Sequence, residues 1–211
     1  MERQKLLKRA LILSVITIFY NITEGVVSVF FGASDDALAL LGFGVDSFVE
    51  VISGIGILHM VIRMGNTDTD TPDSFERQAL KVTGTSFYLL ATGLIIGSVI
   101  NVAMGIKPET TIAGIIISSV SIVTMYFLMK AKLSVGSKLK SDAIIADANC
   151  TKTCFYLSFI LLGSSLLYQF FGIGWFDTIG SLGIAWFAFT EGREAFEKSK
   201  AEKVGCTCGC H

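Results

Sequence analysis

Charged residues are scarce in this chain, at 17% of 211 positions, whereas soluble domains typically carry about 25%. Proline is rarer still: Pro72 and Pro108 are the two in the sequence, and both fall between long apolar segments that they do not interrupt. The formal net charge is -1 and the Lys and Arg residues form no basic stripe, so no nucleic-acid partner is expected. This composition excludes an ordinary soluble domain.

Long apolar runs are what the chain has instead. A helix that crosses a bilayer needs roughly 17–25 mainly apolar residues. The runs of about this length are Ala10–Phe31, Ala37–Ile62, Leu80–Met104, Ile112–Met129, Ile144–Phe170 and Ile173–Phe189. The first is too long for a signal peptide and lacks a small-residue cleavage site. Because lipid cannot satisfy backbone polar groups, we predict an all-α membrane protein with six transmembrane helices.

The placement of Lys and Arg predicts the orientation of these helices. If the six runs all cross the membrane, Lys107 is the one basic residue in the connections on one side. The basic residues on the other side are Arg3, Lys5, Lys8, Arg9, Arg63, Arg77, Lys81, Lys130, Lys132, Lys138, Lys140, Arg193, Lys198, Lys200 and Lys203. Cytoplasmic connections are enriched in Lys and Arg, so both termini are predicted to be cytoplasmic.

The predicted topology divides the chain into two parts. Residues 1–195 form a transmembrane transport domain, and residues 196–211 form a short cytoplasmic tail. We expect an integral multi-pass membrane protein, located in the plasma (inner) membrane if the chain is bacterial.

Two pairs of side chains within the apolar runs point to a metal site. Asp46 and Glu50 are four residues apart, as are Cys150 and Cys154, so each pair shares one face of a helix. Carboxylates inside a membrane usually face a protein interior or a water-filled cavity and mark functional sites. With a rise of about 1.5 Å per residue and antiparallel helices, Asp46 should lie level with Cys154, and Glu50 with Cys150. Two carboxylates and two thiols suit a divalent metal such as zinc.

The charge of this ligand set predicts coupling to protons. Four anionic ligands, ionised together without a metal, would repel one another. The empty site should therefore hold protons, which a metal ion would displace. We expect proton-coupled export of a divalent heavy-metal cation by alternating access, with zinc favoured and cadmium or another soft metal as alternatives.

Other interpretations of these residues remain open. Cysteines in membrane helices are often inert packing residues, and Asp46 and Glu50 would also suit a structural hydrogen-bonding pair. A membrane thiol oxidoreductase would use the cysteines, but the chain has no Cys-x-x-Cys motif and this function leaves the two acids without a role. A membrane metal sensor that does not transport is a further alternative. We expect a transporter and not an enzyme.

The sequence around both pairs resembles the cation diffusion facilitator family. Asp36–Glu50 resembles the second-helix signature of that family, a small and apolar run leading into His/Asp-x-x-x-Asp. Ser141–Cys154 resembles its fifth-helix signature, Ala-Asp-Ala-x-His-x-x-x-Asp, and Trp175–Ser181 resembles the start of its sixth helix. Further matching positions are Glu24, Ser158 and Gly163.

The resemblance implies a homodimeric exporter of zinc or similar cations driven by proton antiport, with a transport site at Asp46, Glu50, Cys150 and Cys154. The chain departs from the family pattern in three ways. Both cysteines replace the fifth-helix His and Asp, Glu50 stands where the family has Asp, and the cytoplasmic metal-binding domain is missing, as in shorter members. Thiolates shift the expected preference towards softer metals.

Three further polar residues in the spans are candidates for the ion path: Asn21, Glu24 and Asp147. Each also has a structural alternative as a hydrogen-bonding residue. Lys152 is interpreted as a lysine that reaches an interface, with a counter-charge role as the alternative. Asp177 is expected to cap the helix in which it lies.

The C-terminal tail is rich in soft ligands. Cys206, Cys208, Cys210 and His211 lie within six residues of one another. A cytoplasmic location favours reduced thiols, and the spacing does not fit a structural zinc finger. We predict a flexible arm that captures metal, with dispensable terminal sequence as the alternative.

Overall fold

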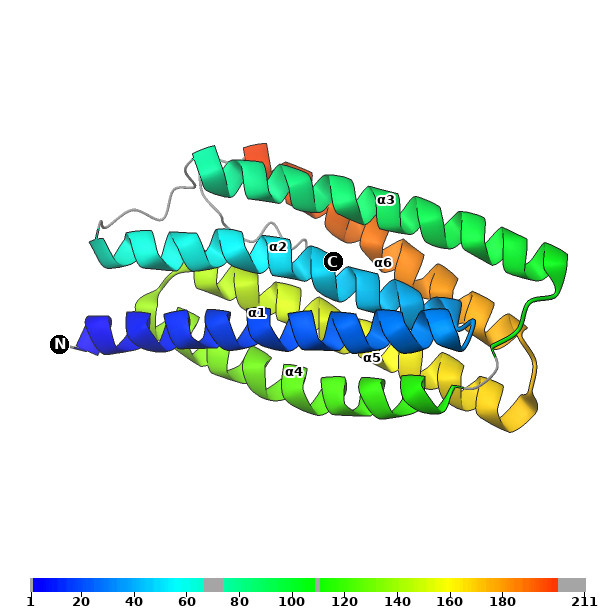
Figure 1. The fold of residues 1–211 in the computed structure, drawn as a ribbon. Helices are drawn as coiled ribbons and strands as arrows, with labels where there is room; N and C mark the ends of the chain where they lie inside the picture. The colour runs from blue at the N-terminus through cyan, green and yellow to red at the C-terminus, as the bar shows by residue number, and fades with distance from the viewer. Residues whose placement is uncertain (1, 67–73, 109–110, 201–211) are drawn as a thin grey trace, which may run out of the picture.

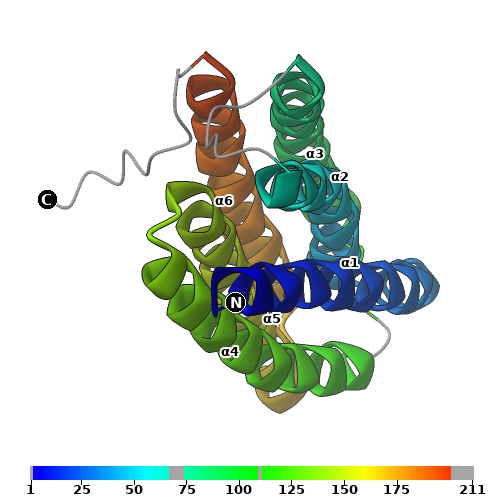
Figure 2. The same ribbon diagram turned by 90° about the vertical axis from the view of Figure 1, so that its left-hand side faces the viewer.

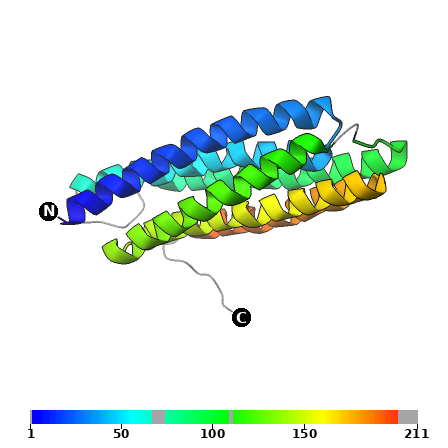
Figure 3. The same cartoon turned by 90° about the horizontal axis from the view of Figure 1, so that it is seen from below.

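A computed structural model describes residues 2–66, 74–108 and 111–200 of the chain. They form six α-helices: α1 (Glu2–Ser34), α2 (Leu38–Asn66), α3 (Ser74–Met104), α4 (Ile112–Leu139), α5 (Asp142–Phe171) and α6 (Trp175–Lys200). The helices run along a common axis in both side views (Figure 1) (Figure 3). The all-helical prediction is confirmed.

Five of the six helices, α1 to α5, are long and apolar enough to cross a membrane. At about 1.5 Å per residue, even a 28-residue helix such as α4 exceeds the roughly 30 Å of a hydrocarbon core. Helix α6 is not among the five, because Asp177 and Glu191 bound a short apolar stretch that also contains Gly180, Ser181 and Gly183. The expectation of six apolar spans is thus shown for five helices.

Successive helices run in opposite directions. The start of α1 lies at the same end of the bundle as the end of α2, the start of α3, the α4–α5 connection and the end of α6 (Figure 1). The α1–α2 and α5–α6 connections lie at the other end (Figure 1). We call the first of these the N-terminal end of the bundle.

Helix α2 is the most central element. It packs against α1, α3, α5 and α6, whereas α3 and α6 pack on each other at one side of the bundle (Figure 2). Close packing uses glycine: a Cβ atom on Gly44 of α2 would lie 2.7 Å from the backbone nitrogen of Val29 on α1. Any larger residue at this position would push the two helices apart. The residues of α2 are therefore surrounded by protein over much of their length.

The side chains are distributed in the opposite way to those of a soluble protein. Large apolar residues cover the outside, among them Phe19, Leu89 and Phe127 at 73%, 70% and 66% exposure. Serines lie in the interior, and the side chains of Ser121 and Ser158 are fully buried and hydrogen-bonded to each other at 2.9 Å. An apolar exterior around a partly polar interior is what a bundle surrounded by lipid requires.

Candidate metal-binding site

Asp46 and Glu50 project from the central helix α2 into the interior. The Asp46 side chain is 1% exposed, and Glu50 is partly exposed because it lines a cavity. A helix places residues four apart on the same face, one turn above the other. Both acids are on α2, the helix that packs against four neighbouring helices.

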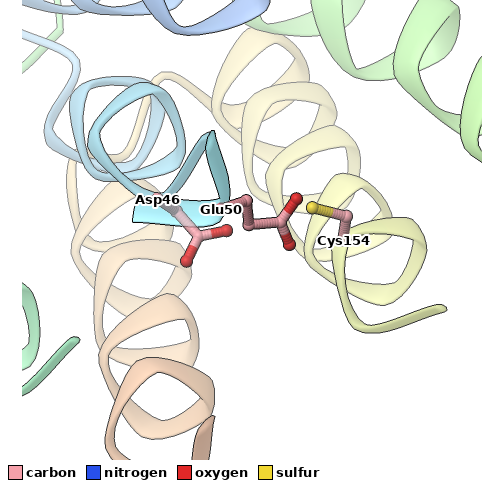
Figure 4. A group of neighbouring side chains, drawn as sticks. All are labelled: Asp46, Glu50 and Cys154. Atoms are coloured by element: carbon pink, nitrogen blue, oxygen red, sulfur yellow. The ribbon is translucent and has the colours of Figure 1, made fainter. Parts of the chain in front are cut away.

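Cys154 completes a cluster with the two acids. Asp46, Glu50 and Cys154 can each offer a ligand atom such that all three atoms lie within 4.8 Å of one another. Figure 4 shows the Glu50 carboxylate between that of Asp46 and the Cys154 sulfur. Cys154 is 1% exposed and comes from α5, which runs antiparallel to α2. The convergence of α2 and α5 that the sequence predicts is present for these three residues.

The hydrogen bonding around the cluster leaves room for a ligand. Asn21 on α1 donates from Nδ2 to Glu50 Oε2 at 2.9 Å, which fixes the orientation of that carboxylate. The Oδ2 atom of Asp46 is buried and has no hydrogen-bond partner among the described residues. Buried polar atoms are nearly always paired, so such an atom needs an explanation, and an ion is one. Two carboxylates and a thiol form a donor set that suits a zinc-like ion.

Cys150 lies outside this three-residue cluster. It is one helical turn from Cys154, about 6 Å along α5, and it is partly exposed. It lines a cavity of about 60 Å³ that also reaches Glu50, Asp147 and Glu191. The structure therefore brings together three of the four predicted ligands and places the fourth on the approach to them.

This inner cavity extends from the three-residue cluster towards the N-terminal end of the bundle. Its wall includes Lys198 near the end of α6 and Met60 towards the end of α2, and it reaches Glu50 and Asn21 in the interior. Its volume is sufficient for a few water molecules. Asp46 and Cys154 do not line it, so the cavity meets the cluster at Glu50.

Glu191 on α6 is a cavity residue that lies beyond the predicted apolar run Ile173–Phe189. In the structure it lines the inner cavity, and its Oε1 accepts a hydrogen bond from the Thr153 hydroxyl at 2.9 Å. Helical periodicity is the signal that could have found it: Ile184 and Ala188 on α6 are buried, and Glu191 follows three residues after Ala188 on the same face.

Glu24 is buried beside the cluster and held by hydroxyl groups. Tyr20 donates to its Oε1 at 2.9 Å, and Ser47 on α2 donates to its Oε2 at 3.1 Å. Both carboxylate oxygens therefore have partners. Two of the predicted ion-path residues are therefore close to the cluster. Asn21 hydrogen-bonds to Glu50, and Glu24, about one turn further along α1, is bonded to Ser47 of α2.

Asp147 pairs with Lys132, which the sequence pattern assigns to the basic residues of the connections between spans. Lys132 is 1% exposed within α4, and its Nζ lies 2.9 Å from Asp147 Oδ2 and 3.0 Å from Thr151 Oγ1. The earlier assignment was wrong because α4 continues to Leu139, well beyond the end of its most apolar stretch. Asp147 also lines the inner cavity, and the ammonium of Lys132 compensates its charge.

The structure also places Lys152 and Asp177, the two other polar residues for which the sequence predicts a role. Lys152 is exposed, with its Nζ 5.7 Å from the centre of the Tyr156 ring, and its predicted place at an interface stays a prediction. Asp177 caps a different helix from the one expected, because Leu38 and Ala39 at the start of α2 donate backbone N–H groups to it at 3.0 and 3.2 Å. The cap ties α6 to the helix that carries Asp46 and Glu50. The predicted tail cluster of Cys206, Cys208, Cys210 and His211 lies outside the described residues.

Comparison with known proteins gives one relevant similarity. No family model matches the chain. A protein of Methanocaldococcus jannaschii that is named an uncharacterized transporter is 29% identical over 182 residues, which cover 84% of this chain. The chain spans 63% of the length of that protein. The name of that protein describes a transporter. Together with the five apolar helices, this similarity points to an integral multi-pass membrane protein.

Proposed function

We propose that this protein transports a divalent heavy-metal cation across a membrane, in exchange for protons, through a site formed by Asp46, Glu50 and Cys154. The observation that carries the proposal is the convergence of three ligand groups from two antiparallel helices within 4.8 Å, with an unpartnered oxygen on Asp46. The named transporter among similar proteins supports a transport role in general. The resemblance to cation diffusion facilitators supports the metal.

The topology proposed for transport has six spans and both termini in the cytoplasm. Helix α6 is the span of lowest apolar content, yet it exposes Ile179 and Trp186 at 61% and 69%, which suits contact with lipid. The basic residues at the N-terminal end of the bundle favour the cytoplasmic side for that end. The inner cavity then reaches Glu50 from the cytoplasm, which corresponds to an inward-facing state. A homodimer is part of this proposal through the family resemblance alone.

The chemistry of the cluster supports exchange of metal for protons. Three groups that would be negative when ionised lie within 4.8 Å in an apolar bundle, and the mutual repulsion of their charges favours protonation when no metal is bound. A metal ion requires a deprotonated thiol and carboxylates, so its binding releases protons. The combination of one sulfur and two oxygen donors suits zinc and cadmium better than magnesium. In alternating access, protons would return to the same side chains after the metal leaves.

Flux into sealed proteoliposomes tests the proposal. The wild type should move zinc and cadmium ions and should move protons in the opposite direction. Asp46→Asn and Cys154→Ser should each lower the flux at least about tenfold, because each removes a direct ligand. Cys154→Ser should reduce cadmium flux more than zinc flux, since cadmium depends more on sulfur.

Glu197→Gln is the matched control for the loss of a carboxylate. Glu197 is exposed and lies 3.6 Å from Arg193 on the same helix, far from the cluster in sequence and contacts. Its flux should equal that of the wild type. If Asp46→Asn and Cys154→Ser both keep wild-type flux, the proposed site is wrong. A protein that binds metal without moving it would be a sensor.

A further inference from the structure

Three residues form a wall between two cavities near the N-terminal end of the bundle. Cys150, Glu191 and Lys198 line both the inner cavity, which reaches Glu50, and an outer cavity of about 260 Å³ between α5 and α6. The outer cavity is also lined by Lys152 and Glu194, which bring charge to it. We call Cys150, Glu191 and Lys198 the α5–α6 partition. These three side chains are the lining residues that the two cavities share.

The partition combines two groups that can bind a metal ion, Cys150 and Glu191, with the positive charge of Lys198. Cys150 offers sulfur, and Glu191 offers a carboxylate of which Oε1 is oriented by the Thr153 hydroxyl. Lys198 is close enough to both to interact with them electrostatically, and its Nζ lies 3.1 Å from Glu194 Oε2. Lys198 is thus held by Glu194, and its positive charge also acts on Cys150 and Glu191. The positive charge of Lys198 therefore offsets the negative charge of Glu191 when no metal is bound.

The position of the partition distinguishes it from the three-residue cluster. Cys150 lies about 6 Å from Cys154 along α5, towards the end of the bundle from which the inner cavity extends. Glu191 comes from α6, which supplies no ligand to the cluster. A cation that moves from the outer cavity to Glu50 would meet Cys150 and Glu191 before it meets Asp46 or Cys154.

We propose that the α5–α6 partition is an access gate in which Cys150 and Glu191 bind a soft divalent cation before it reaches Glu50. The proposal rests on the proposed function for its role, but the binding step does not require transport. On binding, the Cys150 thiol gives its proton to water and the sulfur coordinates the metal. Lys198 stays protonated and paired with Glu194.

Protection of Cys150 from a thiol reagent by cadmium ions tests the gate. Serine replaces the other four cysteines, Cys154 in α5 and the three in the tail, so that Cys150 is the one thiol left in the full chain. The purified protein is treated with a water-soluble methanethiosulfonate, and the rate of modification is measured against cadmium concentration. Cadmium should slow the modification, because a coordinated sulfur cannot attack the reagent.

Substitutions at Glu191 then identify the second ligand. In this single-cysteine protein, Glu191→Gln should raise the cadmium concentration for half-protection by roughly tenfold or more, since loss of a direct ligand should cost at least as much as loss of a supporting residue. Glu191→Asp keeps the carboxylate and should retain most of the protection. Glu197→Gln, on the exposed face of the same helix, should leave it unchanged.

Two results would overturn the gate. One is the absence of protection by cadmium in the single-cysteine protein, and the other is equal protection with Glu191→Gln and without it. Because the cluster already lacks Cys154 in this protein, neither result depends on the transport site. Flux that requires Asp46, together with an unprotected Cys150, would reject the gate alone. A protected Cys150 in a protein that moves no metal would instead reject the transport function.

Discussion

Replacement of Lys132 by methionine should destabilise the bundle severely. Methionine has nearly the length of lysine but no charge, so the substitution leaves Asp147 buried beside an apolar side chain. The two side chains that form the pair are only 2% and 11% exposed, and their charged atoms are 2.9 Å apart. Thr151 would also lose the ammonium that donates to its hydroxyl oxygen.

The distance between the two charges sets the scale of the effect. At 2.9 Å the Coulomb attraction is about 6 kcal/mol with an effective dielectric constant of about 20. Desolvation of both groups offsets much of this in the wild type. Removal of one partner leaves the desolvation of the other uncompensated, and measured losses for such changes are about 3–5 kcal/mol. We expect Lys132→Met to lose that amount of unfolding free energy.

The double variant Lys132→Met/Asp147→Leu separates loss of the pair from an isolated buried charge. It contains no buried charge at these positions, so it should lose less stability than Lys132→Met alone. Lys130→Met is the matched control: Lys130 is exposed on the same helix, and its Nζ lies 5.7 Å from the centre of the Tyr126 ring. It should cost about 1 kcal/mol or less.

Unfolding by SDS in mixed micelles, followed by circular dichroism, measures these free energies. Lys132→Met and Lys130→Met should unfold at clearly different SDS fractions. Equal stability of these two variants would refute the reasoning. So would a double variant that is less stable than Lys132→Met, because the cost would then not come from an uncompensated Asp147.

Two further predictions concern the metal-binding cluster and the helix that carries it. Cadmium binding by the purified protein should strengthen as pH rises, by about tenfold per pH unit for each proton displaced, and Asp46→Asn should make this dependence shallower; a pH-independent affinity, measured by isothermal titration, would argue against proton displacement. Asp177→Ala should lower the unfolding free energy by about 0.5–2 kcal/mol, because the first N–H groups of α2 lose their acceptor, and unchanged SDS unfolding would show that the cap contributes nothing.

Much of the fold could be predicted from the sequence, because apolar run length is a local property. The run that begins at Ala10 lies within α1, and the run that begins at Ala37 starts one residue before α2. The alternation of helix direction follows from short connections. The extent of α4 was less accessible: Lys132 looks like the end of a span, but an ion pair with Asp147 keeps it inside the bundle. Partners distant in sequence decide whether such a charge is buried.

The cluster was predictable to the extent that helical spacing and depth define it. Asp46, Glu50 and Cys154 meet because they lie at similar depths on antiparallel helices. Cys150 has the same chemistry and nearly the same depth, but the rotation of α5 about its axis and the packing of α6 place it on a cavity wall with Glu191. Asp177 likewise caps α2 because the loops bring the two helix starts together.

The amino-acid sequence by itself determined that this chain forms long apolar helices, and that acids and thiols lie one turn apart on two of them. Both are consequences of local composition and the repeat of the α-helix. The tertiary structure alone decided which of those groups converge, which lysine compensates Asp147, and which acid from α6 faces the path to the cluster. These outcomes depend on helix rotation and on contacts between residues far apart in the chain, which no local pattern encodes.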